Sequence, residues 1–240
     1  MTTTAVLVDP PRAGEVLDRL VETSPLSEPE AADLYAAMTK DVVSAVDASG
    51  GPLLVNYRSE DAESEIHDLL DGVVDPDADD VRFEVQVGET FSGRAGNTAT
   101  HLLETEDEGS VAITRPEAAF LARTEIDGAA MKLRSSEVIL GPAPGGRVYF
   151  AAFKDTIDYA DSFAAPAVET LTDRGLDAGH DVDFLETKPV VETGTDLAEA
   201  ITTVRTRRKA ERIVPRHLAE WVAESDLAVE ADDDGLTLVR

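Results

Sequence analysis

Residues 4–8, Thr-Ala-Val-Leu-Val, open the stretch that decides the fold, and residues 52–57, Pro-Leu-Leu-Val-Asn-Tyr, close it. Both runs are apolar and rich in β-branched or aromatic residues, which predicts buried strands. Between them, Ser27-Glu28-Pro29-Glu30 is a helix start signal, and apolar residues then recur at helical spacing from Ala31 to Val46. A strand, a long helix and a second strand predict a βαβ unit, and therefore a parallel sheet with a right-handed crossover.

Strand and helix patterns continue to alternate along the chain. We expect strands at 81–87, 109–113, 137–142, 148–153 and 183–186, and helices at 64–70, 97–105, 116–131 and 165–174. The prediction is an α/β fold over residues 1–196, a three-layer α/β/α sandwich with a mainly parallel sheet and a central first strand. Residues 197–240 are expected to form helices at 197–212 and 215–224 and a hairpin turning at Asp233-Asp234-Gly235, packed on the main domain as an extension.

Composition excludes several classes of protein. The 240 residues include no cysteine and four histidines, which rules out disulfides, thiolate zinc sites and thiol nucleophiles and leaves little for an imidazole-rich metal site. No apolar stretch approaches the roughly 18 to 20 residues that span a bilayer, and the amino end carries no export signal pattern. We therefore expect a cytoplasmic protein without a membrane span.

Charge is the most extreme property of the chain. Lys and Arg number 21 against 49 Asp and Glu, so the net charge is −28, and only five of the cations are lysines. Such a chain should repel nucleic acids and anionic membranes. The acidic, lysine-poor surface resembles that of halophilic archaeal proteins, because molar salt shortens the Debye length to about 3 Å and screens self-repulsion. One basic cluster, residues 205–216, stands out against this background.

Four stretches carry a resemblance to a known family. They read Gly14-Glu15-Val16-Leu17-Asp18-Arg19-Leu20, Ala112-Ile113-Thr114-Arg115-Pro116, Val138-Ile139-Leu140-Gly141-Pro142-Ala143-Pro144-Gly145-Gly146-Arg147-Val148-Tyr149, and Val190-Val191-Glu192-Thr193-Gly194-Thr195-Asp196-Leu197. In this order they resemble the glycosyltransferase-like domain-of-unknown-function 2064 family and its relatives, the 2-phospholactate guanylyltransferases. The resemblance implies the nucleotide-diphosphosugar transferase (GT-A) fold.

The first stretch matches the family's phosphate-gripping loop at Gly14 and Arg19. The family's lysine and threonine are replaced by Leu17 and Asp18. Loss of an ammonium and gain of a carboxylate beside a diphosphate should weaken its binding. An ordinary glycine loop before a helix is the structural alternative.

The second stretch keeps the family's proline, but Arg115 stands where the family has a metal-binding aspartate. A fixed positive charge there either replaces the cation in gripping an anion or marks a site that has lost its chemistry. A surface arginine without a role is the third interpretation.

The third and fourth stretches suggest an acceptor site and a residual metal ligand. By the resemblance, the Gly145-Gly146 turn lies by the acceptor, although a plain β-hairpin would use the same glycines. Glu192 is the one retained signature acid, so Mg²⁺ or Mn²⁺ should bind weakly or not at all. Thr193 or Thr195 acting as a helix N-cap is the alternative explanation of this motif.

The resemblance implies a glycosyltransferase-like protein that binds a nucleotide or nucleotide sugar. Two alternatives stay open: a binding or regulatory protein of the same fold that has lost its chemistry, and a nucleotidyltransferase of the guanylyltransferase type. Open α/β sheets bind ligands at the carboxyl ends of their strands. We therefore expect the six candidate site residues to converge there: Gly14, Arg19, Arg115, Gly145, Gly146 and Glu192.

Overall fold

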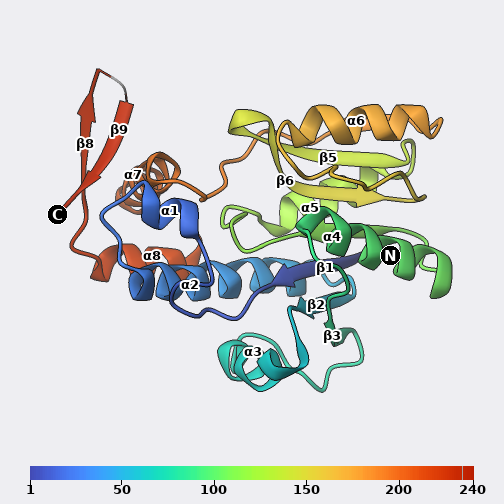
Figure 1. Ribbon diagram of the computed structural model, residues 1–240, viewed down its shortest axis with the longest axis horizontal. Coiled ribbons are helices and arrows are strands. Elements are labelled where there is room, and N and C mark those ends of the chain that lie inside the picture. Colours follow the sequence, from blue (N-terminus) through green and yellow to red (C-terminus); the bar gives the residue numbers. More distant parts are fainter. Residues whose placement is uncertain (234) are drawn as a thin grey trace.

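The computed structural model describes residues 1–233 and 235–240 (Figure 1). Its strands are β1 (Thr3–Val8), β2 (Leu53–Tyr57), β3 (Val81–Val85), β4 (Val111–Thr114), β5 (Val138–Ala143), β6 (Arg147–Phe153), β7 (Val182–Phe184), β8 (Ala228–Asp232) and β9 (Gly235–Val239). Its α-helices are α1 (Asp18–Glu22), α2 (Glu28–Asp47), α3 (Glu63–Leu70), α4 (Phe91–Thr100), α5 (Arg123–Lys132), α6 (Ala167–Asp177), α7 (Gly194–Lys209) and α8 (Arg216–Glu224). None of the helices in this described part is long and apolar enough to cross a membrane.

Seven strands form one sheet in the order β3-β2-β1-β4-β6-β5-β7. Every neighbouring pair is parallel except the two that involve β6, which runs antiparallel to both β4 and β5. β6 reverses because only the short turn Pro144–Gly146 joins it to β5, and Gly145 and Gly146 adopt φ values of 74° and 72° there. The mainly parallel sheet with β1 in its interior confirms the predicted fold class.

Alternation along β1 shows why helices must cover both faces of the sheet. Val6 and Val8 pack in one core with α2, α3 and α5, whereas Ala5 and Leu7 pack in a second core with α4 and α6. Successive side chains of a strand point to opposite faces, so a strand that is apolar at every position is buried on both sides.

The region beyond residue 196 packs against the start of the chain. α7 and α8 share a buried cluster with α1 and the first half of α2. Both carboxylate oxygens of Asp41 accept hydrogen bonds from backbone N–H groups at the start of α8, those of His217 (2.9 Å) and Leu218 (2.8 Å). β8 and β9 pair as the expected hairpin, which projects away from the sheet in Figure 1. Of the predicted turn Asp233-Asp234-Gly235, the middle residue lies outside the described part of the chain. A division into residues 1–196 and 197–240 stays a prediction.

The helix predicted at 116–131 is wrong in its first half. α5 begins only at Arg123, after a non-helical segment in which Ala118, Ala119, Phe120 and Leu121 are buried. This segment is held by tertiary contacts, since the Glu117 carbonyl accepts a hydrogen bond from the Val191 N–H at 2.9 Å. The predicted helix at 97–105 also begins earlier, at Phe91, where the Thr90 hydroxyl accepts a hydrogen bond from the Gly93 N–H.

Candidate functional site

The carboxyl ends of β1, β3 and β4 bring polar residues to one edge of the sheet. Asp9 follows β1 and Arg115 follows β4, and these two parallel strands are neighbours. Gln86 follows β3, and its side-chain amide donates hydrogen bonds to the carbonyls of Val8 (3.0 Å) and Asn56 (2.6 Å). These bonds tie the ends of β1, β2 and β3 together, at the edge where open α/β sheets bind ligands.

A pocket of about 150 Å³ lies at this edge. Its walls are formed by Leu7, Asp9, Tyr35, Gln86, Phe91, Arg94, Arg115 and Glu117. The guanidinium carbons of Arg94 and Arg115 lie 5.9 Å and 5.2 Å from the centroid of the Phe91 ring. Each distance falls within the range of a cation–π contact. One aromatic ring thus positions two permanent positive charges beside the pocket.

Three polar side-chain atoms that line this pocket are buried and lack a hydrogen-bond partner among the described residues. They are Gln86 Oε1, Arg94 Nε and Glu117 Oε2. A buried polar atom without a partner costs about 1–3 kcal/mol, so most such atoms in folded proteins are paired. The pocket therefore contains two hydrogen-bond acceptors and one donor that a bound ligand could satisfy.

Burial controls the ionisation of this pocket. It raises the pKa of Glu117, although the positive charge of Arg115 opposes the shift. It also raises the pKa of Tyr35, whose hydroxyl accepts a hydrogen bond from the Asp9 N–H at 3.0 Å. In both groups, desolvation disfavours the charged form.

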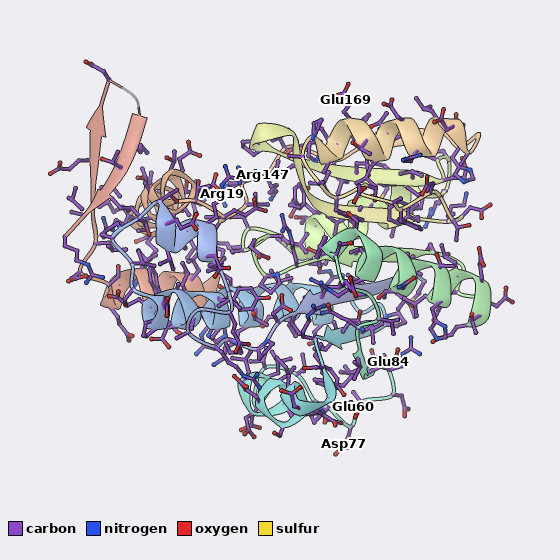
Figure 2. The ribbon with its side chains drawn as sticks, in the orientation of Figure 1. Arg19, Glu60, Asp77, Glu84, Arg147 and Glu169 are labelled. Atoms are coloured by element: carbon purple, nitrogen blue, oxygen red, sulfur yellow. The ribbon has the colours of Figure 1, made fainter. Side chains whose placement is uncertain are left out.

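A network of two arginines and two acids adjoins the pocket. Arg115 forms an ion pair with Glu192, and Arg147 reaches the other Glu192 oxygen at 3.3 Å. Arg147 also makes a bidentate contact with Asp196, at 2.7 and 2.8 Å. Hydrogen bonding to Asp196 raises the pKa of Arg147; burial of Asp196 opposes ionisation, yet its bonds to Arg147 and Thr193 lower its pKa overall. Figure 2 shows Arg147 where the start of β6 faces α7.

The acids of this network do not fit a divalent cation. Each oxygen of Glu192 faces an arginine, and Asp196 accepts bonds from Arg147 and from the backbone N–H groups of Glu192 and Thr193. Within residues 1–233 and 235–240, no group of three or more His, Cys, Asp or Glu residues is arranged to hold a metal ion. Magnesium prefers oxygen ligands, and here the oxygens are already neutralised.

Of the predicted site residues, the structure joins Arg115 directly to Glu192. Gly145 and Gly146 precede Arg147, the second arginine on Glu192, whose Nε donates to the Pro144 carbonyl at 2.7 Å. Gly14 is exposed in the loop after β1 and approaches the Glu28 carboxylate, and Arg19 is exposed on α1. Convergence of all six residues on one ligand stays a prediction.

The N-cap alternative for the fourth stretch is confirmed. The Thr193 hydroxyl accepts a hydrogen bond from the Asp196 N–H at 3.2 Å, and the Asp196 carboxylate accepts one from the Thr193 N–H at 3.0 Å. This reciprocal capping box starts α7. Asp196 therefore serves the helix start and the Arg147 ion pair at once.

Sequence reasoning did not identify six residues that form this region: Asp9, Gln86, Phe91, Arg94, Glu117 and Arg147. A usable signal existed for Asp9, because it directly follows the predicted strand 4–8, whereas Gln86 lies inside the strand predicted at 81–87 and follows β3 only in the structure. Arg147 stood inside a quoted stretch beside the two glycines. Phe91 and Arg94 carried no such signal, because the helix predicted at 97–105 begins after both residues, whereas α4 begins at Phe91.

Comparison with known proteins shows the fold. No protein-family model and no curated protein sequence matches the chain. A solved structure from Desulfovibrio desulfuricans, described as a candidate nucleotide-diphospho-sugar transferase, is 19% identical, covers 93% of this chain and 98% of its own, and has a TM-score of 0.74. A cytidylyltransferase from Leptospira borgpetersenii is 9% identical, covers 93% of this chain and 94% of its own, and has a TM-score of 0.52.

A third solved structure points to the same architecture. The 4-diphosphocytidyl-2C-methyl-D-erythritol synthase from Anaerococcus prevotii is 12% identical, covers 85% of this chain and 98% of its own, and has a TM-score of 0.51. Identities this low are evidence about the backbone and not about the reaction. The chain therefore has the α/β fold of the nucleotide-diphospho-sugar transferase-like proteins.

Proposed function

We propose that the chain binds a nucleotide or nucleotide sugar at the carboxyl edge of its sheet, with arginines in the place of a tightly held metal ion. The observation that carries this proposal is the pair Arg94 and Arg115, which contact the same Phe91 ring beside a pocket with three unpartnered buried polar atoms. Guanidinium groups match phosphate geometry and keep their charge at any physiological pH.

The size of the pocket indicates how much of such a ligand it would hold. About 150 Å³ is smaller than the roughly 300–1,000 Å³ of whole ligand sites, so it suits one end of a nucleotide. A phosphate there would lie against Arg94 and Arg115, and N–H or O–H groups of the ligand would supply partners for Gln86 and Glu117. The remainder of the ligand would extend out of the pocket along the carboxyl edge of the sheet, towards Arg147.

Isothermal titration calorimetry with uridine, guanosine and cytidine diphosphate sugars, each with and without EDTA in molar KCl, tests the proposal. We expect saturable binding that chelator leaves unchanged. Arg115→Ala should weaken binding at least tenfold, because it removes one of the two guanidinium groups that contact the Phe91 ring. It also leaves Glu192 without its Arg115 partner, so that this carboxylate would repel a phosphate. Arg134→Ala, which removes an exposed arginine at the end of α5, is the matched control and should bind as the native chain does.

Three results would contradict the proposal. Binding that requires Mg²⁺ or Mn²⁺ would restore the ordinary metal-dependent GT-A mechanism, and equal affinities of the two arginine variants would make Arg115 a surface charge. Absence of binding by every nucleotide would leave a protein that has kept only the fold.

Glycosyl transfer is the reaction that this binding would serve, with nucleotidyl transfer as the alternative. Glycosyl transfer breaks the bond between the sugar and the diphosphate and releases a nucleoside diphosphate. Nucleotidyl transfer from a nucleoside triphosphate releases pyrophosphate instead. Assays for the two leaving groups separate these activities, and release of neither, with binding retained, identifies a non-catalytic binding protein.

A further inference from the structure

A second and larger cavity, of about 590 Å³, lies away from the site described above. It is bounded by the second half of α2, the segment 119–122 before α5, and the segment that joins α7 to α8. None of its lining residues lines the pocket between Arg94 and Arg115. Its volume falls within the range of small-molecule sites.

The lining of this cavity reverses the charge balance of the chain. Acids outnumber basic residues by more than two to one overall, at 49 to 21. Along the cavity the acids are Asp41 and Asp71. The basic side chains are Lys40, Arg123, Lys188, Arg207, Arg216 and His217. Five of the six come from four separate helices, α2, α5, α7 and α8, so the fold and not one basic segment brings them together.

Some of these charges are neutralised and others are not. Asp41 is occupied by the two backbone N–H groups at the start of α8. Three of the basic residues form ion pairs with acids outside the lining. The pairs are Arg123–Asp127 (3.0 Å), Lys188–Glu125 (3.0 Å) and Arg216–Glu220 (3.1 Å). Lys40 and Arg207 form no side-chain hydrogen bond or ion pair with any described residue. Asp71, the second acid of the lining, has no such partner either, so the cavity carries two cations and one acid without an ion-pair partner among the described residues.

We propose that this cavity binds a small organic anion with at least two negative charges, of the phosphate or polycarboxylate type. Lys40 and Arg207 supply the attraction, and Phe120, Val73 and Val214 line the cavity with apolar surface for the body of the ligand. A nucleic acid or acidic protein would meet the rest of a surface that carries −28, whereas a small ligand would meet only the residues that line the cavity. This proposal does not depend on nucleotide binding at the other site.

Titration calorimetry with inorganic pyrophosphate and with citrate, at one fixed ionic strength, tests it. We expect saturable binding of one of them to the native chain, and the tighter ligand identifies the class. The double variant Lys40→Gln, Arg207→Gln should weaken that binding at least tenfold. The matched control, Arg134→Gln with Lys209→Gln, removes one lysine and one arginine outside the cavity and should leave the affinity within twofold.

Further variants separate this site from the nucleotide site and guard against loss of structure. Ser44→Trp fills the cavity without changing a charge and should also abolish binding. Binding lost in Arg115→Ala but kept in the Lys40 and Arg207 double variant would place the anion at the other site and overturn the proposal. Equal losses in the two double variants, or no saturable binding of either anion to the native chain, would overturn it as well.

Discussion

At the scale of single residues, Arg147 connects three segments that are distant in sequence. Its Nε holds the Pro144 carbonyl in the turn between β5 and β6, and its two terminal nitrogens hold Asp196 at the start of α7. It also reaches Glu192, the partner of Arg115. Buried charges are tolerated where paired geometry offsets their desolvation, and the bidentate Arg147–Asp196 contact is such a case.

Glu117 is the opposite case, because one oxygen of its largely buried carboxylate has no hydrogen-bond partner and lies as far as 4.0 Å from Arg115 Nε, and because burial raises its pKa. A raised pKa in the folded state means that ionisation destabilises the fold, so stability should increase as pH falls from above the raised pKa to below the ordinary one. Glu117→Gln should raise the free energy of unfolding at neutral pH by about 1 kcal/mol, the low end for an unpaired buried polar atom. Denaturant unfolding between pH 4 and 8 measures it.

The control for this prediction is Glu169→Gln, an exposed carboxylate on α6 that Figure 2 labels. It should leave the stability and its pH dependence unchanged. A Glu117→Gln variant that is less stable than the native chain at neutral pH would show that the ionised carboxylate supports the fold.

At the scale of elements, the contact between α1 and α7 allows no side chain at Gly194. A Cβ there would lie 2.1 Å from the carbonyl oxygen of Thr23, and the Gly194 N–H donates to the Thr23 hydroxyl at 2.9 Å. The obstacle is backbone, so the two helices would have to separate. We expect Gly194→Ala to destabilise the chain by about 2–3 kcal/mol, the upper range for overpacking, measured as a shift of the urea midpoint.

Gly128 in α5 is the matched control for this prediction. A Cβ at Gly128 meets only Leu185 Cδ2, at 3.8 Å, which is an ordinary contact. Gly128→Ala should therefore be neutral or stabilise the helix by about 0.5–1 kcal/mol. Similar midpoints for the two alanine variants would mean that α1 and α7 do not pack as described.

At the scale of the whole molecule, the charge of −28 governs how the fold responds to salt. Self-repulsion of an acidic surface opposes the compact state, and salt screens it. We expect the melting temperature to rise from low salt towards molar KCl. Differential scanning calorimetry over a series of KCl concentrations checks this. An unchanged or lower melting temperature in KCl would contradict electrostatic self-repulsion as the cause.

The sequence by itself determined the local elements of this protein and the sign of its surface. β1, α2 and β2 lie within about a residue of their predicted bounds, because two-residue and 3.6-residue periodicity, a Ser27 cap and the glycines after α2 are local signals. The parallel sheet followed from the βαβ order, and the antiparallel β6 follows from a turn too short for a crossover. The Thr193 cap was also readable, since capping involves residues three apart.

Only the tertiary structure decided which side chains share a site. Segment 118–121 is not helical because its apolar residues are buried and Val191, 74 positions after Glu117, bonds to its backbone. Arg147 meets Asp196 across 49 positions, and Arg94 and Arg115 meet over Phe91 from different elements. Lys40 and Arg207, which line the second cavity, likewise come from α2 and α7. Desolvation and charge pairing depend on distance in space, which local periodicity does not encode.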